Sequence, residues 1–423
     1  MYLRYSFRLV PTPGQRIALA RTLGCARVVY NDALAARKAA YAGDKSRIPT
    51  GVLARQVITE AKRTPERAWL AEVSVDALQS SLRDLDTAYA NFFASVAGKR
   101  PGRRMGLPVF KSKKDSRQAV RFSRNGFRLR DNGRLNLAKI GDVRVRWSRE
   151  LPSAPSSVTV VKDASGRYFA SFVVDVEPAT LPPVDAEAGI DLGLMLPQTP
   201  SGGTPIAVLS DGRVIDNPRF LRRAERRLNK AQRALSRKAK GSRNRAKARI
   251  RVARAHARVA DARRNWCHQS ASRLVRDNQA VYLEDLAVSG LARTRLAKSV
   301  HDAAWGMFRR VLEEKAARYG RHVGIVSRWL PSSQTCSVCW VVDGKKPLHV
   351  RIWRCEGCGT EHDRDLNASR VILAAGQAER LNAPGGPVSP GVEIPRQARL
   401  VERGTHPKAQ PVTTGSQAGI PAL

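Results

Sequence analysis

The sequence predicts an α+β protein of several domains, and three observations favour this class. Leu3, Tyr5 and Phe7 alternate with polar residues, which is typical of a half-buried strand, and alternating segments return between about residues 119 and 175. Apolar residues at helical spacing fill the interval between them. A second series of strands and helices follows a proline-rich linker, and a cysteine-rich segment interrupts it. The 423 residues are enough for two or three domains.

Residues 1–10 and 98–180 are expected to form a small β-barrel domain, with a helical domain of residues 11–97 inserted after the first strand. The helical domain begins after Pro11 and Pro13, and its first helix can break at Gly24. The later strands of the barrel are expected at Ala119–Phe122, Val143–Trp147, Val158–Val161 and Tyr168–Val174. The loop-rich segment Gly98–Arg128 carries 11 Lys or Arg and only one acid.

A second domain is expected over residues 185–330, and a helix at 361–376 completes it. Its strands are expected at Ala186–Leu194, Ile206–Ser210, Arg213–Asp216, Ala280–Leu283 and His322–Arg328, with a helix at about Ala303–Tyr319. Met195–Pro205 makes a long first hairpin. Residues 377–423 are rich in Pro, Gly and Gln without an apolar period, so we expect a disordered tail.

Residues 219–264 predict a basic helical hairpin within the second domain. Apolar residues step by three and four along both arms, and the remaining faces carry 18 Lys or Arg between Arg222 and Arg264, against two acids. Such a charge run is often a solvated face. Binding to RNA or to an RNA–DNA heteroduplex is the simplest use of folded arms with this charge, which makes Arg245, Arg249 and Arg254 candidate phosphate contacts.

The charge balance points to a polyanionic partner. Seventy-five Lys and Arg face 36 Asp and Glu, for a net charge of +39. So large a charge repels itself unless an anion neutralises it, and nucleic acid is the default partner, ahead of an anionic membrane surface. No apolar run of about 18 residues and no secretory segment after Met1 is present, so we expect a cytoplasmic protein without a membrane partner.

Two C-x-x-C pairs predict a structural zinc site. Cys336 and Cys339 precede Cys355 and Cys358 by a short interval, and each pair can supply two thiolates from a tight turn. The alternative is four unrelated thiols in a reduced protein. Because all four positions are Cys, the site is closed and offers no open position for catalysis; His362 is expected to be a bystander.

Three acidic residues occupy positions that are unusual for charged side chains in so basic a protein. Asp191 lies in an apolar strand between glycines, Glu284 ends the apolar run Val281–Leu283, and Asp365 opens a helix. Taken singly, each reads as an ion pair, a solvated edge or a helix cap. Together they fit an RNase H-like nuclease, with an Asp on the first strand, a Glu ending the fourth and an acid on a late helix. Such carboxylates bind one or two Mg²⁺ ions that activate water at a phosphodiester.

These motifs resemble the TnpB family, insertion-sequence nucleases related to type V CRISPR effectors. The resemblance rests on Gly189–Leu194, Val281–Leu286, the paired C-x-x-C and the run Asp363–Ala368. It extends to the opening helical domain and to Leu107–Lys113, and covers about residues 1–376 in the family's order. Trp340 stands where the family usually has Gly after the second cysteine, and Met195–Pro205 is longer than usual.

The resemblance implies a wedge-like β-barrel, a helical recognition insert and a RuvC-like nuclease domain with an inserted zinc module at 331–360. Asp191, Glu284 and Asp365 fall on the catalytic positions and imply Mg²⁺ or Mn²⁺, with Asp363 as the alternative third acid. It also implies a guide RNA from the transposon end, a double-stranded DNA target cut beside a short motif, and a monomer with one RNA. A nuclease-inactive regulator and an accessory transposition protein are the alternatives.

Further nucleic-acid contacts are expected in the first half of the chain. Lys111 and Lys113 lie in the basic loop that resembles the family's. Gln79 and Ser80 lie off the apolar stripe of the helix that begins at Val75, and Gln can read adenine. An exposed polar pair without a partner is the plainer account of these two residues.

Overall fold

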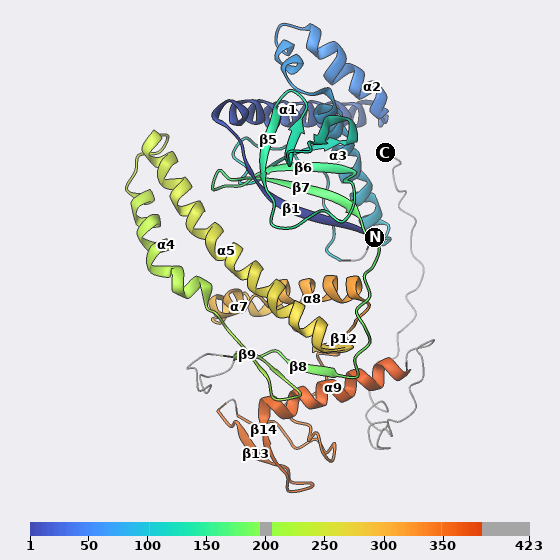
Figure 1. The fold of residues 1–423 in the computed structure, drawn as a ribbon, viewed down its shortest axis with the longest axis vertical. Coiled ribbons are helices and arrows are strands. Elements are labelled where there is room, and N and C mark those ends of the chain that lie inside the picture. Colours follow the sequence, from blue (N-terminus) through green and yellow to red (C-terminus); the bar gives the residue numbers. More distant parts are fainter. Residues whose placement is uncertain (101, 195–204, 348, 383–423) are drawn as a thin grey trace. The chain divides into compact units, whose positions relative to one another are not determined.

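The computed structural model describes residues 1–100, 102–194, 205–347 and 349–382, and it divides into two compact units after Glu177 (Figure 1). The prolines at 178, 182 and 183 follow this boundary. The long loop expected at Met195–Pro205 and the tail after residue 382 lie outside the described residues, apart from Pro205. No helix of the described residues is long and apolar enough to cross a membrane.

The first unit contains a seven-stranded antiparallel sheet in the order β2-β6-β7-β1-β5-β4-β3. The strands are β1 (Tyr2–Val10), β2 (Gln118–Ser123), β3 (Phe127–Leu129), β4 (Arg134–Leu137), β5 (Gly141–Arg146), β6 (Ser157–Lys162) and β7 (Tyr168–Asp175). The sheet curls around one core that includes Phe7, Phe122 and Phe172. No hydrogen-bonded ladder joins β2 to β3 within the described residues, so the expected closed barrel is not formed by strand pairing.

Three helices and several short helical turns lie between β1 and β2. They are α1 (Pro13–Asp44), α2 (Thr50–Ala54) and α3 (Val75–Val96), with π-helical η1 (Arg55–Glu60) and the 3₁₀ turns η2 (Ala61–Arg63) and η3 (Ala68–Glu72) between the last two; η4 (Arg124–Gly126) links β2 to β3. Thr12 and Gln15 start α1 with a reciprocal capping box. The break expected at Gly24 is absent, because the buried Leu23 and Cys25 hold that turn against the core.

The second unit contains a five-stranded sheet in the order β10-β9-β8-β11-β12. The strands are β8 (Glu187–Asp191), β9 (Pro205–Leu209), β10 (Val214–Asp216), β11 (Ala280–Glu284) and β12 (His322–Val326); β13 (Ile352–Arg354) and β14 (Glu361–Asp363) form a separate hairpin. β8, β9 and β10 pair antiparallel, whereas β8, β11 and β12 are parallel. The carboxyl ends of those three parallel strands therefore meet at one edge.

Helices cover both faces of this sheet. They are α4 (Phe220–Ser236), α5 (Arg243–Asp277), α6 (Val288–Leu291), α7 (Ala297–Ala303), α8 (Trp305–Tyr319) and α9 (Arg364–Asn382). The C-terminal part of α5 and α8 pack on one face, with Cys267 and Phe308 in the core, and α9 packs on the other face against Tyr282 (Figure 1).

Several expected bounds were wrong, and packing explains each. The basic hairpin does not end at 264, because α5 runs on to Asp277 and buries Ala271 and Leu274 in the core. The apolar seam of its second arm was expected at Ile250, Ala253, Ala257 and Ala260. The seam is shifted, since Ala248, Ala255 and Val259 are buried whereas Ile250 and Ala260 are exposed. The last helix continues to Asn382, so residues 377–382 do not belong to a disordered tail.

Smaller differences follow the local backbone. A helix over 303–319 was expected as one piece, but Ala304 is left-handed (φ 58°) and separates α7 from α8. The last parallel strand ends at Val326, two residues before its expected end. The hairpin of β3 and β4, which surrounds the turn at 131–133, was not expected as a pair of strands.

Candidate functional site

Two carboxylates stand at the ends of neighbouring parallel strands in the second unit. Asp191 is the last residue of β8 and Glu284 the last of β11, and the two strands are in register through Ile190 and Leu283. The Leu192 backbone N–H donates a hydrogen bond to the Glu284 carboxylate. Asp191 and Glu284 therefore lie next to each other, although 93 residues separate them in the sequence (284 − 191).

Gly189 lets the helix that carries the third acid approach this strand. A Cβ atom at position 189 would lie 2.1 Å from the backbone oxygen of Ser369 and 2.5 Å from the backbone nitrogen of Leu373, both in α9. Only a residue without a side chain fits so close a contact. The glycine two residues before Asp191 thus brings the first turn of α9, with Asp365, toward the strand end.

Burial raises the proton affinity of all three acids, and the charges of the other two raise that of Asp191 further. Burial and then the charges of Glu284 and Asp365 raise the pKa of Asp191 well above its usual range. Burial raises the pKa of Glu284 to about 7 and also raises that of Asp365. Gathered, partly buried carboxylates are unfavourable unless protons or cations neutralise them. Their oxygen atoms are the ligands that Mg²⁺ prefers, so these residues fit a divalent ion.

Arg351 is a functional candidate that the sequence did not reveal. Its Nη1 atom lies 3.2 and 3.0 Å from the two carboxylate oxygens of Asp365, and both side chains are largely buried. The Arg351 guanidinium also counteracts the raised pKa of Asp191 and Asp365. The 15-residue spacer between the cysteine pairs also contains Arg354, and neither arginine belongs to a pattern that would have identified Arg351.

Asp363 has a different role from Asp365. The Asp363 carboxylate accepts hydrogen bonds from the backbone N–H groups of Asp365 and Leu366, at 3.0 and 2.9 Å, and so caps the start of α9. The charge of Asp363 raises the pKa of Asp365, but it is not among the groups that shift Asp191. The geometry therefore favours Asp365 as the third acid.

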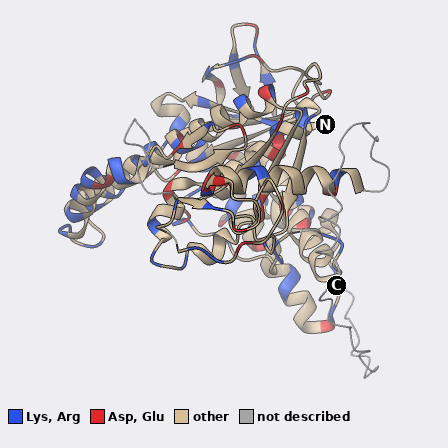
Figure 2. Cartoon of the chain, turned by 90° about the horizontal axis from the view of Figure 1, so that it is seen from below, with Lys and Arg blue, Asp and Glu red and all other residues tan. Residues whose placement is uncertain are grey.

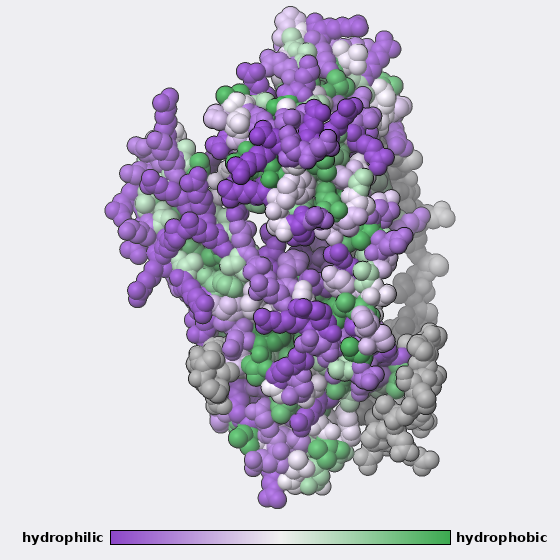
Figure 3. All heavy atoms as spheres, in the orientation of Figure 1, coloured by the Kyte–Doolittle hydropathy of each residue, from purple (hydrophilic) through white to green (hydrophobic). Residues whose placement is uncertain are grey.

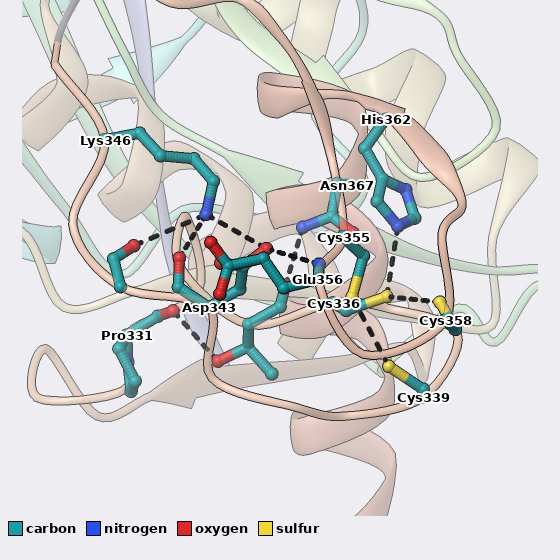
Figure 4. A network of polar contacts seen from close by, with 12 residues as sticks. Pro331, Cys336, Cys339, Asp343, Lys346, Cys355, Glu356, Cys358, His362 and Asn367 are labelled. Carbon is teal, nitrogen blue, oxygen red and sulfur yellow. Dashed lines mark hydrogen bonds and ion pairs between the residues drawn. The ribbon is translucent and has the colours of Figure 1, made fainter.

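The four cysteines form a compact cluster in the segment before α9 (Figure 4). Their sulfur atoms lie within 4.8 Å of one another, with Cys336 3.7 Å from Cys358 and Cys339 3.6 Å from Cys355. A tetrahedral ion with Zn–S bonds of about 2.3 Å requires sulfur atoms roughly 3.8 Å apart. The thiol geometry thus fits a closed zinc site that needs little rearrangement.

Two neighbours connect this cluster to the rest of the second unit (Figure 4). The Asn367 side chain, from the first turn of α9, donates to the Thr335 oxygen at 2.7 Å and accepts from the Ser337 N–H at 2.8 Å. His362, expected to be a bystander, is buried, and its Nε2 atom lies 3.1 Å from the Cys336 sulfur. Such contacts orient metal ligands. Asn367 also ties the cysteine segment to the helix that carries Asp365.

Trp340 has left-handed backbone geometry, with φ of 65°, directly after Cys339. The second pair has the matching geometry after Cys358, where Gly359 has φ of 70°. Glycine adopts this conformation without strain, whereas a side chain such as tryptophan does so rarely. Trp340, which stands where the family usually has glycine, therefore adopts the same turn geometry as Gly359 at a conformational cost.

A second side chain that the sequence did not reveal lies beyond the same sheet edge. Val326 at the end of β12 is in register with Glu284, and Trp329 follows it by three residues with 85% of its surface exposed. Arg328, beside it, pairs with Asp285, which follows Glu284. An exposed indole near buried acids is available for stacking on a base.

The expected nucleic-acid contacts fall in different environments. Arg249 and Arg254 are exposed on α5, where Lys and Arg gather along the hairpin of α4 and α5 (Figure 2), whose surface is largely hydrophilic (Figure 3). Arg245 is engaged within the protein, because its guanidinium donates to the carbonyl oxygens of Leu235, in the last turn of α4, and of Lys238, just after α4. Arg245 thus stabilises the hairpin turn.

The contacts expected in the first unit differ in the same way. Gln79 and Lys113 are exposed, whereas Ser80 is buried and was wrongly expected on the polar face of α3. The Lys111 ammonium lies 3.8 Å from the centre of the Tyr30 ring, and its backbone exchanges two hydrogen bonds with the Asn31 side chain. Burial lowers the pKa of Lys111, which anchors this loop.

Family profiles match three parts of the chain. Residues 1–46 match a "Helix-turn-helix domain", residues 171–295 a "Probable transposase" and residues 305–372 a "Cas12f1-like, TNB domain". A solved Cas12f1–sgRNA–target DNA complex is similar with a TM-score of 0.51, covering 85% of this chain and 83% of that one. At 15% identity, this likeness shows the fold alone.

Curated relatives cover nearly the whole chain. A Streptomyces pristinaespiralis protein named "Putative RNA-guided DNA endonuclease" is 44% identical over 99% of this chain and 98% of its own length. An Escherichia coli protein named "Putative RNA-guided DNA endonuclease InsQ" is 30% identical over 88% of this chain and 92% of its own. The chain therefore belongs to the TnpB family, as the order of its motifs predicted.

Proposed function

We propose that this chain is an RNA-guided DNA endonuclease that cuts both strands of a target beside a short DNA motif. The observation that carries the proposal is the convergence of Asp191, Glu284 and Asp365: burial raises the pKa of each, and the charges of Glu284 and Asp365 raise that of Asp191 further. A basic protein gains nothing structural from burying three carboxylates together. The arrangement is useful when divalent cations bind there.

The strand order of the second unit supports an RNase H-like, RuvC-type nuclease domain. β8 is its first strand and carries Asp191, β11 is its fourth and ends in Glu284, and the late helix α9 carries Asp365. The three acids would hold Mg²⁺ or Mn²⁺, which would activate water and stabilise the leaving oxygen of the phosphodiester. Arg351 neutralises Asp365 when no cation is bound, and exposed Trp329 can stack on a base of the DNA strand.

Target choice is assigned to a guide RNA, since phosphate contacts carry no sequence information. The net charge of +39 and the basic hairpin of α4 and α5 support a large RNA partner. Exposed Gln79 on α3 is a candidate for reading the short motif in the target. The zinc site would be structural, and one chain would act with one RNA.

The test is programmed cutting. The chain is produced with RNA from the neighbouring transposon end, the bound RNA is sequenced, and its terminal segment is then exchanged. We expect cutting at sites that match the new segment, with a need for Mg²⁺ or Mn²⁺. Specific cutting by RNA-free protein would refute the guide, and guided binding without cutting would favour the nuclease-inactive regulator.

A further inference from the structure

A cavity of about 270 Å³ opens in the first unit, outside the residues already assigned a role. It lies between α1, the segment that follows α1, α3 and Leu107 of the basic loop. This volume is at the small end of ligand sites and suits one planar ring system better than a duplex or a helix. The cavity lies wholly within the first unit.

Aromatic side chains line this cavity. Tyr89 and Phe93, one turn apart on α3, lie with ring centres 6.4 Å apart and an angle of 19° between their planes, and half-buried Tyr41 faces them from α1. Phe93 is 36% exposed and Leu107 53% exposed. Tyr89 packs against the neighbouring core of Leu82 and Leu85, whereas Tyr41 and Phe93 are not part of it. Tyr41 and Phe93 therefore offer apolar surface that this core does not use.

The charges around the cavity favour an anion that carries a ring. The one acid in the lining, Asp86, is neutralised by Arg37 at 2.6 Å and also accepts from Thr50. Arg37 in turn lies 5.5 Å from the centre of the Tyr89 ring. Lys38 and Arg47 line the same cavity and are exposed, and among the described residues neither has an acidic partner.

A nucleotide meets both requirements, since its base can stack on the rings while its phosphates meet Lys38 and Arg47. A second copy of this chain does not, because it would add another charge of +39. Unpaired bases are characteristic of loops and bulges in folded RNA, where proteins stack them on aromatic side chains. A DNA target is paired with its complement or with the guide, except along the strand that the guide displaces.

We propose that this cavity holds an unpaired base of the bound RNA. Tyr41, Tyr89 and Phe93 would stack on or enclose the base, and Lys38 and Arg47 would meet the flanking phosphates. This assignment of the cavity rests on the proposed function in one respect, namely that the chain binds an RNA. It does not require that the chain cleave DNA.

The direct test is crosslinking of the full, RNA-free chain to a single-stranded RNA of about 12 nucleotides that contains 5-iodouridine. We expect a crosslinked peptide that includes Tyr41, Tyr89 or Phe93. Crosslinks confined to the hairpin of α4 and α5 would overturn the proposal. Equal crosslinking by the same sequence as a duplex would overturn it too, because a paired base cannot enter the cavity.

Affinity provides a second readout. We expect Phe93→Ala and Tyr89→Ala to bind this RNA about tenfold more weakly, and Tyr89→Phe to bind as wild type does. Tyr2→Ala is the matched control, because Tyr2 is 73% exposed and lies outside the cavity. Phe93 is partly exposed, so its replacement leaves the core intact. Affinities of both alanine variants within twofold of wild type, or dimers that Phe93→Ala abolishes, would overturn the proposal.

The outcome separates this inference from the proposed function. A chain that binds RNA through the cavity but cuts no DNA would refute the nuclease and keep the cavity assignment. A guided nuclease whose Phe93→Ala variant binds and cuts as wild type does would refute the cavity assignment alone.

Discussion

The cysteine cluster and the acid trio are both candidate metal sites in the second unit, yet they are assembled in opposite ways. Each cysteine pair comes from one tight turn, and the four sulfur atoms already lie within 4.8 Å of one another. Among the residues that the structure describes, no other group of three or more such ligands is that close. The acids come from two strands and a helix, and one of them is held by Arg351.

The difference has a physical reason. Thiols are weakly polar and can be buried together without a large electrostatic penalty, so local turns can preassemble them. Carboxylates repel one another, and bringing them together raises their pKa values unless a cation is present. A structural site can therefore be closed in advance, whereas a site for Mg²⁺ needs a temporary partner such as Arg351.

The largest expected effect separates the two sites. Asp191→Asn should reduce cleavage by more than about 1,000-fold, because it removes a cation ligand, and should leave RNA binding and one zinc per chain unchanged. Its melting temperature should equal or exceed that of wild type, since the substitution removes a buried, repelled charge. Cleavage assays, zinc analysis and calorimetry check these outcomes; a loss of zinc would show that the sites are not separate.

Loss of the zinc site, in contrast, should strongly impair cleavage at the acid trio. Cys355→Ser should lose zinc and lower cleavage by about 100-fold, because Asn367 joins the cysteine segment to the helix that carries Asp365. Cys25→Ser is the matched control, since Cys25 is a buried thiol outside the cluster. Elemental analysis and rates at saturating Mg²⁺ test this coupling. Active protein without zinc would contradict it.

Arg351→Gln tests whether Arg351 only neutralises Asp365 or also contacts the substrate. If Arg351 only neutralises Asp365, the variant should reach half-maximal cleavage at about tenfold lower Mg²⁺ and keep its maximal rate. A lower maximal rate at saturating Mg²⁺ would instead indicate contact with the substrate. Arg354→Gln, an exposed arginine that bonds to the Gly359 oxygen, is the control and should change neither quantity.

The acids should also make cation binding depend on pH. Glu284, whose pKa is about 7, is largely protonated at pH 6 and largely ionised at pH 8. A cation competes with this proton, so the half-saturating Mg²⁺ concentration should fall about tenfold between these values. For the same reason stability without Mg²⁺ should fall as pH rises through 7, and Mg²⁺ should restore it. Thermal melts at both pH values, with and without Mg²⁺, provide the check.

The smallest effect is expected at Asp363. Asp363→Ala should cost about 1 kcal/mol of stability, because it removes the cap of α9, and should change cleavage by only a few fold. Urea unfolding and cleavage rates measure both. Complete loss of cleavage in Asp363→Ala, with activity kept in Asp365→Ala, would reverse the assignment of the third acid.

Much of this organisation could be predicted from the sequence because the signals are local. Alternation located β6 and β7, an apolar run located β11, and the spacing of the cysteines indicated their cluster before any fold was known. The seam of α5 was misplaced because the helix is rich in alanine on several faces, so its sequence does not distinguish the face that α4 covers. The disordered tail was expected to begin at residue 377, which is too early. Gln377 and Arg380 are polar, but both bond to Glu187 in the folded unit.

By itself, the sequence determined the chemical parts: a basic chain, four thiols in two turns, and acids that end apolar strands or open a helix. Only the tertiary structure decided which groups meet. The sheet brings Asp191 and Glu284 together, Gly189 admits α9 with Asp365, and the cysteine segment supplies Arg351 and receives Asn367. Thiol pairs are close because they are neighbours along the chain. Carboxylates 93 and 81 residues apart (284 − 191 and 365 − 284) become neighbours only when the packing of a whole unit offsets their repulsion.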